Sequence, residues 1–113
     1  MTTSDEFTGI SDVQMRLIRE ELEEQLSRRN TQLRDLRSAV DGGGGEAVAR
    51  LDALAEIATT ERAISEIGKS LARMDDGSYG TCADCGTEIP FNRLKIRPLT
   101  RYCITCQRRH ETR

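Results

Sequence analysis

Hydrophobic residues between positions 11 and 40 recur every three or four residues, which is the period of an amphipathic α-helix. Ser11 with Gln14 fits a capping box, and Asp12 lies in the first turn, where the helix dipole favours a negative charge. No Pro or Gly interrupts the stretch. We therefore expect a helix that starts at Ser11. Its apolar stripe comprises Met15, Ile18, Leu22, Leu26, Leu33, Leu36 and Val40.

A second helix is expected from Glu46 to Asp75 or Asp76, where Gly77 closes it. From Ile64 to Met74 its apolar residues are three, four and three positions apart, as in a heptad repeat. The whole expected stripe comprises Val48, Leu51, Leu54, Ile57, Ile64, Ile67, Leu71 and Met74.

The glycines of 42–45 separate the two helices. Four glycines cost too much backbone entropy to stay helical, and they allow a chain reversal. They are not a phosphate-binding loop, because neither a preceding strand nor a following Lys is present. The short connection predicts that 11–76 forms a long antiparallel coiled-coil hairpin. Residues 1–10 are expected to be a flexible N-terminus and not a signal peptide, because they lack an apolar core and a basic start.

Length and composition indicate one small domain, or one small domain with an extended appendage. The 113 residues are 32% charged and include two Phe, two Tyr and no Trp, so a thick core is not expected. There is no apolar run of the ~18 residues that a membrane span needs. Residues 1–80 carry 10 basic and 16 acidic side chains, and residues 81–113 carry 7 and 3. This surplus is too small to indicate strong sequence-independent DNA binding.

The four cysteines form two Cys-x-x-Cys pairs, Cys82 with Cys85 and Cys103 with Cys106. This spacing is typical of a structural zinc site, because each pair can present two thiolates from one tight turn. Gly80 and Gly86 allow the tight backbone around the first pair. We expect one structural Zn²⁺ per chain, bound by all four cysteines.

Other uses of the cysteines are less favoured. Two disulfides would need an oxidising compartment, and a redox pair would be expected near a βαβ pattern that is not visible. An iron site is a further alternative, because iron also binds sulfur-rich ligand sets. Four thiolates fill the coordination sphere, whereas catalytic zinc usually keeps a water. His110 lies four residues after Cys106 and could reach the metal, but a solvent-facing side chain is favoured.

The rest of the 77–113 zinc-finger domain is predicted to be short helices. Pro90 can start a helix over Phe91–Lys95 that Pro98 ends, and residues 107–113 are a short polar helix or a frayed tail. A basic cluster is either solvated surface or a contact for an acidic partner or phosphate; it comprises Arg93, Lys95, Arg97 and Arg101. The predicted fold class is all-α dominated: a long antiparallel coiled-coil helical hairpin, a small four-cysteine zinc finger and a short C-terminal helix.

These motifs resemble the zinc finger of the DksA/TraR family. The resemblance rests on the Gly-Ser-Tyr-Gly lead-in at 77–80, the run Ile89-Pro90-Phe-Asn-Arg93-Leu94, Arg97-Pro98, and Cys103-Ile-Thr-Cys106-Gln107. The hairpin before the finger matches the family in layout.

The resemblance implies a bacterial cytoplasmic protein that binds RNA polymerase. Family members insert the hairpin into the secondary channel, dock the zinc end on its rim and alter promoter complexes, often with a guanosine tetraphosphate alarmone. They do not bind specific DNA sequences. The zinc site holds the finger together and performs no chemistry, so an enzyme is not expected.

The hairpin tip departs from the family pattern. Well-known members carry Asp-x-x-Asp-x-Ala there, whereas this chain has Ala-Val-Asp-Gly-Gly-Gly at 39–44, with Asp41 out of register. The partner-binding candidates are Asp41, Glu46, Arg93, Lys95 and Arg97. We expect a polymerase-channel regulator with altered tip activity. The alternative is a zinc-stabilised coiled-coil adaptor for another protein.

Overall fold

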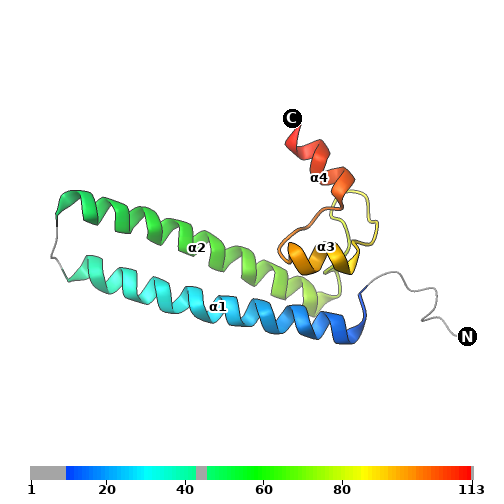
Figure 1. The fold of residues 1–113 in the computed structure, drawn as a ribbon, viewed down its shortest axis with the longest axis horizontal. Helices are drawn as coiled ribbons and strands as arrows, with labels where there is room; N and C mark the ends of the chain where they lie inside the picture. The colour runs from blue at the N-terminus through cyan, green and yellow to red at the C-terminus, as the bar shows by residue number, and fades with distance from the viewer. Residues whose placement is uncertain (1–9, 43–45, 113) are drawn as a thin grey trace, which may run out of the picture. The chain divides into compact units, whose positions relative to one another are not determined.

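The computed structural model describes residues 10–42 and 46–112. This part of the chain holds four helices and no strand: α1 (Asp12–Asp41), α2 (Ala47–Asp76), α3 (Phe91–Ile96) and α4 (Ile104–Glu111) (Figure 1). The predicted helical fold class is therefore confirmed. The expectations for residues 1–9 and for glycines 43–45 lie outside the described residues. The chain divides into two compact units, residues 1–20 with 70–113 and residues 21–69.

The start of α1 follows from its capping residues. The Ser11 amide donates to Gln14 Oε1 at 2.9 Å, and the Gln14 amide donates to Ser11 Oγ at 3.1 Å. This is the reciprocal pair of a capping box, which satisfies two amides that the first turn would leave unpaired. The helix therefore begins where the sequence pattern predicts it.

The end of α2 is equally well defined by its local sequence. Gly77 has a φ of +83°, and the Ser78 amide donates to Arg73 O at 3.0 Å, as in a Schellman motif. The hydroxyl and amide of Ser78 both donate to Asp76 Oδ1 and lower the pKa of that carboxyl group. The chain therefore leaves the helix at Gly77, as predicted.

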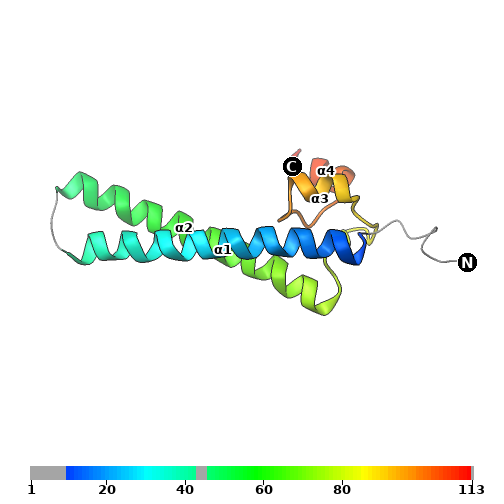
Figure 2. The ribbon, with the colours of Figure 1, turned by 60° about the horizontal axis from the view of Figure 1, so that its bottom comes forward.

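The helices α1 and α2 lie side by side in opposite directions in both units (Figures 1 and 2). In the first unit Arg19 pairs with Asp75 at 2.6 Å. In the second unit Arg37 pairs with Glu61, and Arg50 Nη1 donates to Val40 O at 2.9 Å. Residue numbers rise along α1 as they fall along α2, so the hairpin is antiparallel as predicted.

The seam between the helices is a single narrow stripe. On α2 its positions alternate by four and three residues and are all buried or half-buried: Ala53, Ile57, Thr60, Ile64, Ile67, Leu71 and Met74. The predicted α1 stripe is also buried or half-buried throughout. In the second unit, sequence reasoning missed three half-buried polar residues of α1, namely Gln25, Arg29 and Gln32. The seam is therefore partly polar in the second unit.

The N-terminal third of the predicted α2 stripe was wrong. Val48, Leu51 and Leu54 are exposed and do not belong to the seam. These three residues are three positions apart, which is less than one turn of 3.6 residues, so each successive side chain lies further around the helix. They therefore do not lie on the face that the heptad of Ile64–Met74 defines. That heptad continues through Ile57 and Ala53 instead.

The short helices of the finger differ slightly from the prediction. Helix α3 follows Pro90 and ends before Arg97, whose φ of −126° is not helical. Pro98 disfavours a helical conformation at the residue before it, as expected. Helix α4 begins at Ile104, ahead of Cys106, whereas the prediction placed a helix only after Cys106.

A small apolar core holds the finger in the first unit. Tyr79, Ile89 and Leu94 are almost fully buried, and Ile10 is buried beside Gly80. The Tyr79 hydroxyl donates to Pro98 O at 2.7 Å, and burial raises its pKa to about 12. In the part of the chain that the structure describes, no helix combines the length and apolar character needed to cross a membrane.

Candidate metal centre

The first Cys-x-x-Cys pair lies on a tight turn closed by backbone hydrogen bonds. The Cys82 amide donates to Thr87 O at 2.8 Å, and the Gly86 amide donates to Cys82 O at 3.0 Å. Gly86 has a φ of +75°, a conformation that costs glycine little and other residues more. The turn folds both thiols of the pair toward one point.

The second pair belongs to the N-terminus of α4. Cys103 is the N-cap residue, and Cys106 lies in the first turn. The unpaired amides and the dipole of a helix N-terminus favour anionic sulfur. The Ala83 amide donates to Arg101 O at 2.8 Å and ties the first turn to the segment that leads into this pair.

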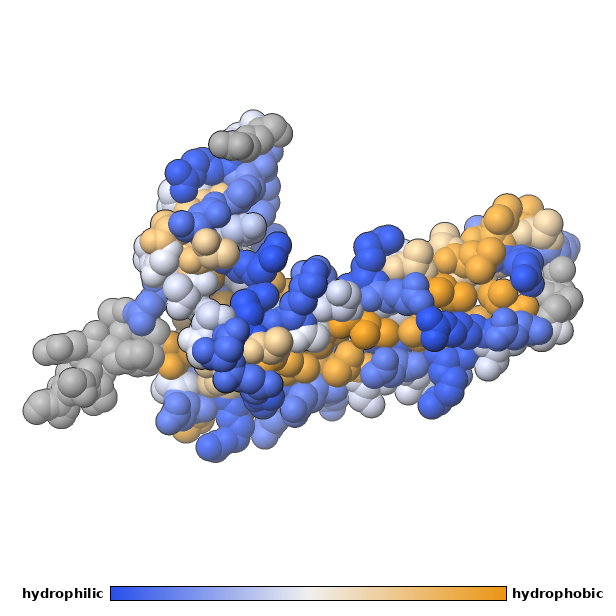
Figure 3. Space-filling view, turned by 180° about the vertical axis from the view of Figure 1, so that it is seen from behind, coloured by the Kyte–Doolittle hydropathy of each residue, from blue (hydrophilic) through white to orange (hydrophobic). Residues whose placement is uncertain are grey.

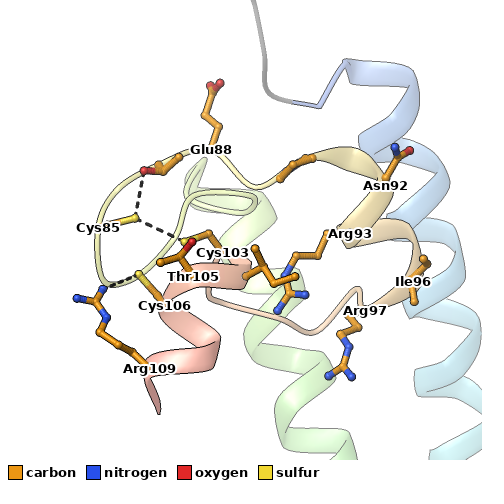
Figure 4. Close-up of a pocket in the computed structure, with 13 residues that line it drawn as sticks. Cys85, Glu88, Asn92, Arg93, Ile96, Arg97, Cys103, Thr105, Cys106 and Arg109 are labelled. Atoms are coloured by element: carbon orange, nitrogen blue, oxygen red, sulfur yellow. Dashed lines mark hydrogen bonds between the residues drawn. The ribbon is translucent and has the colours of Figure 1, made fainter. Parts of the chain in front are cut away.

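The structure brings all four predicted cysteines together. Their Sγ atoms lie within 4.8 Å of one another, and Cys85 Sγ is 3.8 Å from Cys103 Sγ (Figure 4). Zn–S bonds of about 2.3 Å in a tetrahedron separate neighbouring sulfurs by about 3.8 Å, so the cluster fits the ion. His110 is not part of this group.

Local groups prepare two of the thiols for ionisation. Burial opposes ionisation of Cys82, but the amides of Cys85, Cys103 and Asp84 outweigh it and lower its pKa to about 6. The hydroxyl and amide of Thr87 lower the pKa of Cys85. Hydrogen bonds to the anionic form stabilise it, which is the state that binds a metal.

Cys106 has the opposite tendency. Burial raises its pKa to about 12, and its three sulfur neighbours act in the same direction. Arg109 Nη2 donates to Cys106 Sγ at 3.0 Å and offsets part of that effect. A bound dication would supply the remaining charge compensation.

Sequence reasoning missed two contacts around the centre. One is the Arg109 hydrogen bond to Cys106. The other joins His110 Nε2 to Asp84 Oδ2 at 2.6 Å, while the His110 ring packs on Tyr102 with centroids 4.4 Å apart. His110 is therefore not simply a solvent-facing side chain. It links α4 to the first cysteine turn, and no local pattern indicates that pairing.

The predicted partner-binding residues lie in two separate places. Asp41 ends α1 and Glu46 precedes α2, and both are exposed. On α3 and just after it, Lys95 and Arg97 are exposed, whereas Arg93 is half-buried and donates from Nε to Tyr102 O at 3.2 Å. Arg93 therefore also supports the finger fold.

A groove of about 830 Å³ opens beside the metal centre, between α3 and the start of α4 (Figure 4). Arg93 and Arg97 line it together with two apolar residues, Ile96 and Ile104. Ile96 is 79% exposed and Ile104 is 50% exposed. The finger thus presents a mixed basic and apolar surface.

Comparison with known proteins gives this centre a family. Residues 77–111 match the prokaryotic dksA/traR C4-type zinc finger. The chain is 40% identical over 65 residues to the RNA polymerase-binding transcription factor DksA of Caulobacter vibrioides, covering 55% of this chain and 46% of the relative. It is also 40% identical over 50 residues to the Escherichia coli K12 protein of the same name, covering 44% and 33%. The aligned region spans less than half of each relative.

The fold agrees over a longer stretch. The transcription factor DksA2 from Pseudomonas aeruginosa superposes with a TM-score of 0.81, covering 90% of this chain and 86% of that chain at 22% identity. The structural likeness therefore includes the hairpin that the sequence matches do not fully cover. The family match and the clustered thiols identify the metal as structural Zn²⁺. Residues 77–111 therefore form a dksA/traR C4-type zinc finger, and the fold of the chain resembles that of DksA2.

Proposed function

We propose that this protein regulates transcription by binding RNA polymerase through the secondary channel, with an altered hairpin tip. The observation that carries the proposal is a DksA/TraR-type finger attached to an antiparallel hairpin of two 30-residue helices. Both parts occur in relatives whose names describe transcription factors, and the DksA relatives are named as RNA polymerase-binding. The proposed site of action is cytoplasmic.

The zinc would act structurally in this function. Four thiolates saturate a tetrahedral ion and leave no position for a substrate or a reactive water. The side chains of this chain hold and orient the finger: Arg109 and Thr87 contact the sulfurs, and His110 fixes α4 to the first turn. We infer that the protein is a binding factor and not an enzyme.

The finger surface supports contact with a protein partner. Lys95 and Arg97 are exposed cations, and Ile96 and Ile104 offer apolar area beside them. Apolar anchors with basic neighbours suit a protein surface that carries acidic groups. Arg93 would contribute less directly, because its guanidinium already supports Tyr102.

The tip chemistry supports a changed effect after docking. Asp41 and Glu46 are the carboxylates next to the glycine turn, and they lie at the ends of different helices. An Asp-x-x-Asp spacing is absent from the described tip, where Asp35 and Asp41 of α1 are six positions apart. The hairpin therefore has fewer suitably spaced carboxylates with which to perturb a metal ion or a basic loop of the polymerase.

Competition with a DksA relative tests the proposal. The purified protein should displace labelled Escherichia coli DksA from RNA polymerase at micromolar concentration, and it should shorten open-complex lifetimes less than DksA does. A Lys95→Glu, Arg97→Glu variant should compete more weakly, whereas Asp41→Asn, Glu46→Gln should compete equally well. Failure to compete would favour the adaptor alternative. Full shortening of lifetimes would show that the altered tip is sufficient.

A further inference from the structure

The second unit contains an apolar surface that the hairpin itself does not use. Val48 is 67% exposed, Leu51 65% and Leu54 43%, on the first two turns of α2 and just beyond. Figure 3 shows hydrophobic side chains gathered over the loop end of the hairpin. The half-buried apolar residues of α1 at this end are Leu33, Leu36 and Val40.

The hydrophobic pattern of α2 is wider than a two-helix hairpin needs. Nine of the twelve residues from 47 to 58 are apolar. A coiled-coil seam uses two positions in seven, whereas a helix in a larger bundle uses three or more. The seam takes Ala53 and Ile57, so Leu51 and Leu54 form a second apolar ridge beside it.

The loop end is also poorly covered. Within the described parts of 26–42 and 46–59, no residue is buried. By contrast, Leu22 and Ile67, which lie nearer the middle of the hairpin, are buried. Two helices bury one seam and leave their outer faces in water. A third and a fourth helix would complete the packing.

The charges of this end are divided between the two helices. Residues 28–41 of α1 carry four basic and two acidic side chains. Residues 46–61, which are Glu46 and the first half of α2, carry four acidic and one basic. The Arg37–Glu61 pair shows this opposition within one chain. A two-fold arrangement that lays α1 of one copy over α2 of another would repeat it between chains.

We propose that the loop ends of two copies associate through the ridge of Leu51 and Leu54 to form an antiparallel four-helix bundle. A second copy fits because the contact is self-complementary: apolar ridges meet in the centre, and each basic helix faces an acidic one.

Sedimentation of the full zinc-loaded chain tests the proposal. The mass should rise with concentration from 12.7 kDa toward twice that value, without larger species. Leu51→Glu should weaken the association by at least about tenfold, because it places a charge in the centre of the contact. Leu17→Glu is the matched control, since Leu17 is 55% exposed on α1 outside the ridge, and it should associate like the wild type.

Three results would overturn the proposal: a monomer at every concentration up to the high micromolar range, an unchanged Leu51→Glu dimer, or equal weakening by Leu17→Glu. Leu54→Glu provides a second test if Leu51→Glu loses helicity. Raising the salt from low to physiological concentration should weaken the dimer, because screening reduces the opposed charges. A dimer that salt only strengthens would exclude the α1-over-α2 arrangement. None of these outcomes depends on RNA polymerase.

Discussion

At the residue scale, the contact between Arg109 and Cys106 shows how the chain supports its metal site. The guanidinium donates to a sulfur whose pKa is raised by burial. Groups that hydrogen-bond a metal ligand typically change metal affinity by about 10–100-fold when removed. Arg109 is therefore a positioning and charge-compensating residue for the zinc thiolates.

Replacing Arg109 should accelerate zinc loss. We expect Arg109→Gln to lower zinc affinity by about tenfold or more, measured by competition with a chromogenic chelator. Arg108→Gln removes the same charge from the neighbouring residue, which is exposed and lies outside the cysteine cluster, and it should leave affinity nearly unchanged. If the two variants lowered zinc affinity equally, Arg109 would act only through its contribution to the net charge and not through its hydrogen bond to Cys106.

Tyr79 gives the finger a predictable response to alkaline pH. Its pKa rises from the ordinary 10.0 to about 12 because the phenol is buried, so folding favours the neutral form. This stabilisation is complete below pH 10 and is lost as the pH rises through about 12. Tyr79→Phe should cost about 1 kcal/mol at neutral pH, because Pro98 O loses its donor.

The difference between wild type and Tyr79→Phe should shrink and then reverse between pH 10 and about 12, since only the wild type must keep a phenol neutral. Urea unfolding of both proteins across this range measures it. Tyr102→Phe is the control for the general effect of losing a tyrosine. A constant difference between wild type and Tyr79→Phe would show that burial does not control the ionisation of Tyr79.

At the element scale, the hairpin depends on a few buried positions. Leu22 is fully buried in the seam, whereas Leu17, earlier on α1, is 55% exposed. Leu22→Ala should destabilise the protein by about 2–5 kcal/mol, because it leaves a cavity. Leu17→Ala should change stability by no more than about 0.5 kcal/mol. Chemical denaturation at low protein concentration compares them, and similar losses would contradict the assigned seam.

The elements that local chemistry specifies could be predicted from the sequence. Ser11 and Gln14 set the start of α1, Gly77 sets the end of α2, and the cysteine spacing predicts the cluster. The sequence does not show which residues of α2 face α1 near the loop end. The reason is that α2 has apolar residues on more than one face there. Ala53 belongs to the seam, although Leu51 and Leu54 are larger and more hydrophobic.

Contacts between distant segments also escaped prediction. His110 and Asp84 are 26 residues apart, and neither has a neighbour that indicates the pairing. The start of α4 was misplaced because Cys103, not a preferred N-cap residue, occupies its N-cap position. Both features depend on the folded path of the finger.

At the scale of the whole molecule, the metal and the hairpin should contribute separately to the fold. The finger has few buried apolar residues, so structural zinc must supply much of its stability, and such sites contribute apparent free energies of roughly 10–16 kcal/mol. Zinc removal should unfold residues 77–113 and leave much of the α1 and α2 helical signal.

Circular dichroism and amide exchange before and after chelation check this prediction. Refolding on addition of Zn²⁺ is the control for irreversible damage. An unchanged finger after complete metal loss would contradict a structural role for the zinc. Complete loss of helicity would show that the hairpin depends on the finger.

Direct binding to RNA polymerase core enzyme tests the central claim. The fluorescently labelled, zinc-loaded protein should bind with a Kd in the micromolar range or tighter, and binding should weaken as salt screens Lys95 and Arg97. A Cys82→Ser, Cys85→Ser variant that cannot hold zinc should bind much more weakly while its hairpin remains helical. Absence of binding by the intact protein well above micromolar concentration, under conditions where DksA binds, would contradict the account.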